Sequence, residues 1–344
     1  MRTLATALLA LCLTAGAATA QETQTLRVAK QFGIGYLQQI LLEDSKLIER
    51  HAERAGLRLS VQWSTFRSSD VMIEALLSDT LDVASLGLAG LALVADRTRG
   101  RQEIRGIAGL NVIDLVLTVR KPGVNTLRDF AANDRIAVPA VKVSNQAILL
   151  QMAAAKLFGE ANWGQLDNLT VSMAHPDATA AMIGGQSEIV ANFSSPPFYY
   201  RQLKTPGIRK LASANDILGE PFSFNALAAT GAFRTRNPRV LAAFLGALDE
   251  TTAWIHADKR RAAEAYLRIS GDRASIDDVM EILNDSANRF TTQPLGVKTW
   301  VDFMAKIGML RSAPARWQDL YHPEAFRAGQ SLSLIHISEP TRHG

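Results

Sequence analysis

Side chains able to hold a small anion gather where the sequence predicts strands to end and helices to begin. Ser68, Ser144 and Asn145 are examples, each at a predicted helix start. The free N–H groups and the positive dipole end of a helix start attract anions. Hydroxyl and amide side chains add further donors. A sulfonate or carboxylate would fit such donors without a full counter-charge.

The candidate ligand-binding residues lie at this position, because ligands of open parallel sheets bind beyond the carboxyl ends of the strands, or at the two predicted chain crossings, as Asn111 and Asn225 do. They are Gln31, Phe32, Tyr36, Phe66, Ser68, Ser69, Gly87, Leu88, Asn111, Lys142, Val143, Ser144, Asn145, Asn192, Ser194 and Asn225. The aromatic members could line an organic tail, and Lys142 could supply a counter-charge. Plainer roles stay open: the serines cap helices, Lys142 is solvated, and the aromatic rings pack the sheet.

The sequence motifs give little support to an enzymatic function. The sequence holds no His-Glu-x-x-His, Gly-x-Ser-x-Gly or Walker A pattern, and its histidines are scattered singly. The glycines of Gly33-Ile34-Gly35 lack the third glycine of a dinucleotide fingerprint, because Gln38 stands there. We therefore expect no catalytic residues, no metal and no cofactor.

Composition sets the broad class of the chain. Its 344 residues are 47% apolar and 20% charged, which is typical of a globular α/β protein and excludes disorder. The 37 Lys and Arg against 33 Asp and Glu leave a net charge of +4. So small an excess over a chain of this length is not the footprint of a nucleic-acid-binding protein.

Both ends of the sequence stand apart from the rest. Residues 1–20 combine a short basic start, an apolar run and the small-residue site Ala18-Thr19-Ala20, which together predict a cleavable signal peptide and export. The single cysteine, Cys12, would be removed with it. Residues 331–344 resemble a translated sequencing adapter and are left out of the functional interpretation.

Strands alternate with amphipathic helices in the first third of the chain. Hydrophobic periodicity predicts strands over 26–29, 57–66 and 81–86, with helices over 37–56 and from 69 onward. Residues 87–90 are predicted as a loop after the third strand. This alternation favours βαβ units and a sheet dominated by parallel strands.

The middle of the chain repeats the plan, and the last third becomes helical. Strands are predicted over 113–119, 135–138, 188–193 and 222–227, with a helix opened by residues 141–146. Helices follow over 238–256, 259–269 and 276–283, the first of them after the start signal Asn237-Pro238.

Three segments carry a family resemblance. They are ALLSDTLDVASLGLAGL, HPDATAAMIGGQSEIVANFSSPPF and TGAFRTRNPRVLAAFLGALDETTAWI. Together they resemble the periplasmic substrate-binding proteins of ABC importers, in the branch for nitrate, taurine and alkanesulfonates. The resemblance runs from Leu26 to about Phe326. One departure is the loop Gly87-Leu88-Ala89-Gly90, where a proline is common in the family.

The resemblance implies a type II periplasmic-binding-protein-like α/β fold of two lobes joined by two hinge crossovers. The first lobe would comprise residues 21–112 and 225–330, and the second residues 113–224. The implied protein is a monomeric periplasmic receptor for a small organic anion, sulfonate or taurine-like, with an inner-membrane ABC permease as partner. A nitrate or pyrimidine ligand is the alternative within the class, and an exported hydrolytic enzyme the alternative outside it.

Overall fold

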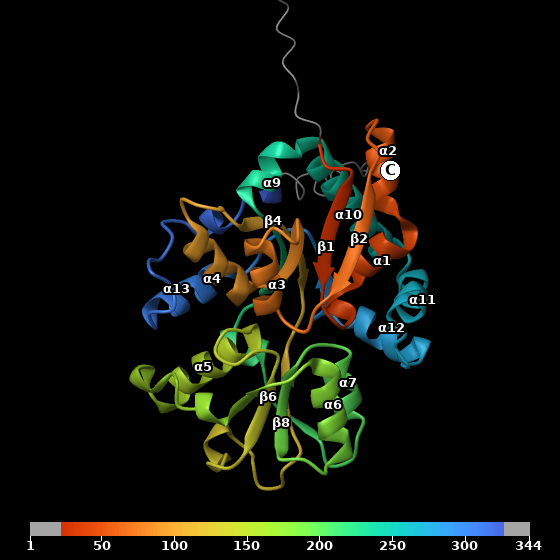
Figure 1. Ribbon diagram of the computed structural model, residues 1–344. Coiled ribbons are helices and arrows are strands. Elements are labelled where there is room, and N and C mark those ends of the chain that lie inside the picture. Colours follow the sequence, from red (N-terminus) through yellow and green to blue (C-terminus); the bar gives the residue numbers. More distant parts are fainter. Residues whose placement is uncertain (1–21, 327–344) are drawn as a thin grey trace, which may run out of the picture.

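The computed structural model describes residues 22–326, and it contains two β-sheets, each flanked by helices (Figure 1). The predicted signal peptide and the adapter-like end lie outside these residues. We call the six-stranded sheet with its helices the first lobe, and the five-stranded sheet with its helices the second lobe. The lobe boundaries at 112/113 and 224/225 stay a prediction.

The first lobe holds strands in the order β11-β4-β10-β3-β1-β2. The strands are β1 (Thr25–Lys30), β2 (Ser60–Thr65), β3 (Val83–Gly87), β4 (Arg105–Val112), β10 (Ser223–Ala229) and β11 (Arg289–Phe290). The helices are α1 (Leu37–Ser45), α2 (Leu47–Arg54), α3 (Ser69–Leu77), α4 (Leu88–Thr98), α9 (Gly231–Arg236), α10 (Pro238–Ala257), α11 (Lys259–Ser270), α12 (Ile276–Asn284) and α13 (Val297–Lys306).

The second lobe holds strands in the order β7-β6-β8-β5-β9. The strands are β5 (Val116–Val119), β6 (Arg135–Val138), β7 (Thr170–Ser172), β8 (Ile189–Ser194) and β9 (Arg209–Ser213). The helices are α5 (Asn145–Phe158), α6 (His175–Gly184), α7 (Phe198–Leu203) and α8 (Ala214–Leu218).

The α/β class is confirmed, but the sheets are mixed rather than dominated by parallel strands. Parallel pairing joins β1 to β2 and β3, and β6 to β7 and β8. All other pairs are antiparallel, because β10 returns to the first sheet and β5 enters the second in the opposite direction to their neighbours. The local βαβ pattern could not show these crossing strands.

Several predicted elements change at their ends. The helix expected over 37–56 is two helices, because Lys46 adopts a left-handed conformation between them. The strand expected over 113–119 is the short β5, preceded by β4. The loop expected over 87–90 is wrong: Gly87 ends β3 and is the N-cap of α4, which starts at Leu88. Helix α4 is almost wholly buried, so core packing explains the early start.

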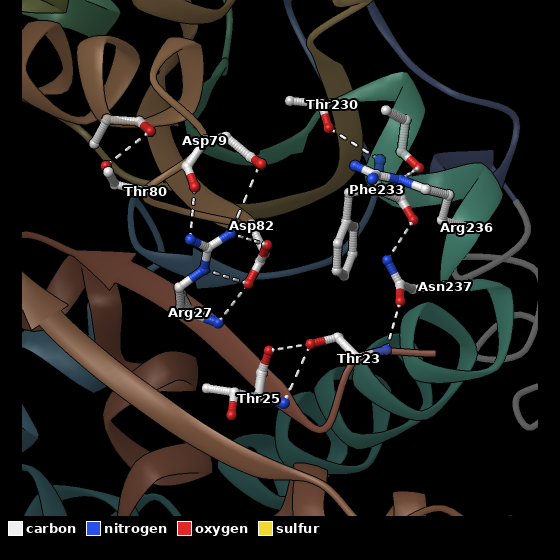
Figure 2. Close-up of polar contacts among 12 residues, drawn as sticks. Thr23, Thr25, Arg27, Asp79, Thr80, Asp82, Thr230, Phe233, Arg236 and Asn237 are labelled. Atoms are coloured by element: carbon white, nitrogen blue, oxygen red, sulfur yellow. Dashed lines mark hydrogen bonds and ion pairs between the residues drawn. The ribbon is translucent and has the colours of Figure 1, made fainter. Parts of the chain in front are cut away.

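An ion pair links β1 to the start of β3 within the first sheet (Figure 2). The Arg27 side chain on β1 donates from two nitrogens to Asp82, at 2.7 and 3.0 Å, just before β3 begins. Nearby, the backbone N–H of Thr23 donates to Asn237 at 2.8 Å, which joins the chain before β1 to the start of α10. These contacts hold β1 in place, and the end of β1 forms part of the candidate site.

Across residues 22–326, every helix is too short or too polar to cross a membrane.

Candidate ligand-binding cleft

A small cavity lies between the lobes, and we call it the cleft centre. Its volume is about 20 Å³, room for roughly one ordered water. The first lobe contributes Gln31, Tyr36, Ser69, Gly87, Gly90, Phe224 and Asn225, and the second contributes Pro139, Val143, Ser144, Asn145, Gln146 and His175. The two lobes are therefore closed onto each other at this point.

Two helix starts meet in the cleft centre. Helix α4 begins after Gly87, and α5 begins after its N-cap Ser144, whose hydroxyl accepts from the Ala147 N–H at 3.3 Å. The same hydroxyl donates to the Ala140 carbonyl at 2.7 Å. Ser144 is thus the N-cap predicted from sequence, and its only hydroxyl proton already has an acceptor. The free N–H groups of both helices make this point favourable for negative charge.

Asn145 joins the lobes through its side-chain amide. Its Oδ1 accepts from the Ala89 N–H in the first turn of α4 at 2.9 Å, and its Nδ2 donates to the Phe224 carbonyl at 2.7 Å. Gly87 permits this approach, because a Cβ there would lie 2.9 Å from the Asn145 Oδ1. We call this contact the Asn145 bridge. It places an amide oxygen at the helix start where an anion's oxygen would bind.

A second amide lines the floor of the cleft centre. The Tyr36 hydroxyl donates to Oδ1 of Asn225 at 3.3 Å, while Nδ2 of Asn225 is buried and without a partner among the described residues. Buried polar atoms are normally hydrogen-bonded, so an unpartnered donor in a cavity marks a place for a ligand or a water. Burial raises the pKa of Tyr36, so its hydroxyl stays protonated.

His175 lines the cleft centre, although the sequence analysis did not include it among the candidates. It is buried at the start of α6, stacks on Phe198 with ring centroids 5.1 Å apart, and lies 3.4 Å from the Gln146 amide. Its Nδ1 has no partner within the described chain. Burial lowers the pKa of His175 to about 4, so the ring is neutral near pH 7.

The cleft centre contains polar groups but no formal charge at neutral pH. Neither a lysine nor an arginine is among its lining residues, and His175 is neutral. A bound anion would be held by helix N–H groups, amides and hydroxyls. This agrees with the donor set expected from sequence and gives Lys142 no place in it.

Half of the sixteen candidate residues meet in the cleft centre, and half do not. Those in the lining are Gln31, Tyr36, Ser69, Gly87, Val143, Ser144, Asn145 and Asn225. Outside it are Phe32, Phe66, Ser68, Leu88, Asn111, Lys142, Asn192 and Ser194. Whether the eight lining residues bind a ligand stays a prediction.

The residues outside the lining have identifiable places. Phe66 packs against the main hydrophobic core, and Leu88 is fully buried within it. Phe32 is 41% exposed and lines a neighbouring cavity. Lys142 is exposed and takes a left-handed backbone conformation (φ 64°) just before α5. Ser68, the N-cap of α3, is buried and makes no side-chain cap bond.

The remaining polar candidates serve the interior of the lobes. Asn192 donates to the Ala137 carbonyl at 3.0 Å and accepts from Gln202 at 2.7 Å, which links β8 to β6 and α7. Asn111 donates to the Gly35 carbonyl. Ser194 is buried at the end of β8, away from the cleft centre. These side chains fix the strands whose ends form the cleft.

Sequence reasoning missed five lining residues, namely Gly90, Pro139, Gln146, His175 and Phe224. Gly90 and Gln146 lie within the predicted segments 87–90 and 141–146, Pro139 follows the strand predicted over 135–138, and Phe224 adjoins the candidate Asn225. His175 had a usable signal as well, because it stands beside Pro176 and Asp177 at a helix start. No group of three or more metal-binding side chains occurs in residues 22–326.

Similar folds are found among solved structures. The alkanesulfonate-binding protein SsuA from Xanthomonas axonopodis pv. citri, bound to MOPS, has a TM-score of 0.67 and 18% identity over 86% of this chain and 96% of that chain. The periplasmic aliphatic sulphonate binding protein SsuA from Escherichia coli gives 0.63 and 18%, over 87% and 99%. The periplasmic nitrate-binding protein NrtA from Synechocystis PCC 6803 gives 0.71 and 13%, over 93% and 92%.

These likenesses define the fold, which is that of two-lobed periplasmic binding proteins. The three neighbours are named as binding proteins, not as enzymes. No protein-family model matches the sequence, and no curated protein sequence matches it.

Proposed function

We propose that the chain is the solute-binding receptor of an ABC importer. It would capture a small organic anion, sulfonate or taurine-like, in the cleft between its lobes and deliver it to an inner-membrane permease. The observation that carries the proposal is that the starts of α4 and α5 meet beside Nδ2 of Asn225, which has no partner among the described residues. In the complex, the anion's oxygens would take the place of the Asn145 Oδ1 at α4, and the lobes would close over it.

The proposal includes a periplasmic location, a cleavable signal peptide over residues 1–20, a monomeric state and no bond-breaking step. Its support is the binding-protein fold and the signal-peptide-like pattern of residues 1–20. A nitrate-sized anion is the second candidate ligand, because the closed cleft centre has only about 20 Å³ of space. An uncharged pyrimidine-type ligand would be favoured by the absence of a cation from the lining.

A thermal-shift screen tests the proposed function. Taurine, ethanesulfonate, nitrate and uracil would be added singly to the purified protein, with acetate as a reference anion. A ligand at about a hundred times its dissociation constant stabilises the folded state by about 2.7 kcal/mol, which raises the unfolding midpoint visibly. No shift with any of them, together with turnover of ester or phosphate substrates, would contradict the receptor and favour the hydrolase.

Ser144→Asp tests where the anion binds. Aspartate is a good N-cap, so α5 should persist and the melting temperature should change little. The added carboxylate would place a negative charge at the cleft centre, and we expect anion affinity to fall at least about tenfold. Thr230→Asp, which changes the N-cap threonine of α9, is the control. Equal affinity in all three proteins would place the anion elsewhere.

A further inference from the structure

A second and much larger cavity lies beside the cleft centre, and we call it the side cavity. It has a volume of about 490 Å³, within the range of small-molecule binding sites, against about 20 Å³ for the cleft centre. It is formed where the end of β1 and the end of α11 face the start of α7, on the side of the molecule where α7 lies below α11 and α12 (Figure 1). Both lobes therefore contribute walls.

The walls of the side cavity are aromatic and aliphatic. The aromatic residues Phe32, Phe198 and Tyr266 and the aliphatic residues Ile40 and Ile269 are among its lining residues. Phe32 and Ile269 are 41% and 37% exposed, which is unusual for large apolar side chains in this chain. A ligand that covered these two residues would gain from the hydrophobic effect.

The charges around the side cavity are paired except for one. Lys30 forms an ion pair with Glu43 at 2.5 Å, and Arg201 forms one with Asp272. Arg273 also lines the cavity, and in residues 22–326 neither an acidic partner nor a hydrogen bond engages its side chain. The cavity therefore combines an apolar interior with one uncompensated guanidinium.

Asp272 does not cancel the charge of Arg273. Its carboxylate accepts from the Tyr266 hydroxyl at 2.9 Å and from the Ala274 N–H at 2.8 Å, in addition to Arg201. These bonds occupy both of its oxygens. A guanidinium that is free to form two parallel hydrogen bonds is suited to a carboxylate or sulfonate.

We propose that the side cavity is a second ligand site, specific for an aromatic monoanion. The ring system packs among Phe32, Phe198 and Tyr266, and the carboxylate or sulfonate pairs with Arg273. Because the walls come from both lobes, such a ligand stabilises the closed arrangement. Phe198 also stacks on His175 of the cleft centre, so the two sites share one wall.

Calorimetric titration with naphthalene-2-sulfonate tests this site, with 2-naphthol as the uncharged comparison. Arg273→Ala should weaken the sulfonate about tenfold, the size expected for a lost charged hydrogen bond, and leave 2-naphthol unchanged. Ile269→Trp should abolish binding of both by filling the cavity. Ile269 is partly exposed, so this variant should fold. Arg260→Ala is the control for the loss of an arginine, because Arg260 is an exposed residue of α11 that does not line the side cavity.

The outcomes separate this site from the proposed function. Taurine or ethanesulfonate binding that Ile269→Trp leaves intact belongs to the cleft centre and does not bear on the side cavity. The side-cavity proposal is overturned if the wild-type protein fails to bind naphthalene-2-sulfonate. It is also overturned if Ser144→Asp weakens that ligand while Arg273→Ala and Ile269→Trp do not.

Discussion

Two of the regions that join the lobes differ in their chemistry. In the cleft centre, the Asn145 bridge is buried and neutral, and both of its hydrogen bonds end on backbone groups. The other region, which we call the outer clasp, is charged and partly exposed. It joins α7 to the α11–α12 segment through Tyr200, Arg201, Lys204, Asp272, Asp278, Glu281 and Asp285.

The outer clasp has more contacts than the Asn145 bridge, but each of its exposed ion pairs should contribute less free energy to closure. Lys204 reaches Asp278 at 2.5 Å and Glu281 at 2.8 Å, yet its side chain is 51% exposed. Exposed ion pairs contribute about 0–1 kcal/mol and are screened by salt. An unpartnered buried polar group costs about 1–3 kcal/mol. The single buried bridge should therefore govern closure more strongly than the clasp.

Asn145→Ala should have the largest effect. It leaves the Ala89 N–H and the Phe224 carbonyl without partners in the closed form, so closure should weaken by about 1–3 kcal/mol, or roughly 5- to 150-fold. Hydrogen exchange of the α4 start should become faster by a similar factor. Asn162→Ala, at an exposed asparagine of the second lobe, is the control. Unchanged protection at Ala89 would mean that the bridge does not hold the lobes.

As the pH falls, the cleft centre should lose stability at a higher pH than the outer clasp does. Because burial lowers the folded-state pKa of His175 from 6.5 to about 4, stability present above pH 6.5 should be lost as pH falls toward 4. We expect a loss of about 1–2 kcal/mol between pH 7 and pH 5. Lys204 lowers the pKa of Asp278 to about 2, so the clasp carboxylate keeps its charge there.

Denaturant unfolding at pH 7 and pH 5 measures this difference, with His175→Gln as the comparison. The variant lacks the titrating ring and should show a smaller loss of stability on acidification. An equal loss in both proteins would assign the acid sensitivity to other groups.

Gly87→Ala should have an intermediate effect that acts on the bridge alone. Gly87 has a φ of −59°, which alanine adopts readily, so β3 and α4 should form normally. The added methyl would press on the Asn145 amide and weaken closure by about 1 kcal/mol, the low end for overpacking. Gly184→Ala, where a Cβ would meet no neighbouring atom, is the control. Hydrogen exchange at the Ala89 N–H should become about fivefold faster in the first variant and stay constant in the second.

Lys204→Ala should have the smallest effect. It removes two exposed ion pairs, so we expect a change below about 1 kcal/mol that fades as salt rises from about 0.05 M to about 0.5 M. Unfolding of both proteins at the two salt concentrations measures it. A larger effect, or one that persists in salt, would reverse the ranking of clasp and bridge.

Local sequence patterns were enough for much of the fold. The strand at β1, the helices α10 to α12 and the N-cap of α5 follow from periodicity and capping residues alone, because those signals act within a few residues. The antiparallel crossing strands were missed, since the direction in which β10 meets β3 depends on the whole chain. The early start of α4 was missed for the same reason, because its burial depends on packing against β3, β10 and α13.

Local patterns were also insufficient to predict which residues line the candidate site. Sequence placed Ser144 and Asn145 at a helix start and Asn225 at a chain crossing, and these residues do line the cleft centre. It could not decide which neighbours turn inward, so Asn192 and Asn111 were included although they bond within the lobes. The Asn145 bridge and the outer clasp join residues far apart in sequence, and no local pattern encodes such pairs.

Small-angle scattering of the ligand-free protein tests the ranking of bridge and clasp most directly. Wild type and Asn145→Ala would each be measured at about 0.05 M and about 0.5 M salt, where screening of exposed charges differs strongly. We predict that the wild type keeps the same radius of gyration at both concentrations and that Asn145→Ala is larger at both. Expansion of the wild type in high salt, with Asn145→Ala no larger than wild type in low salt, would contradict the account.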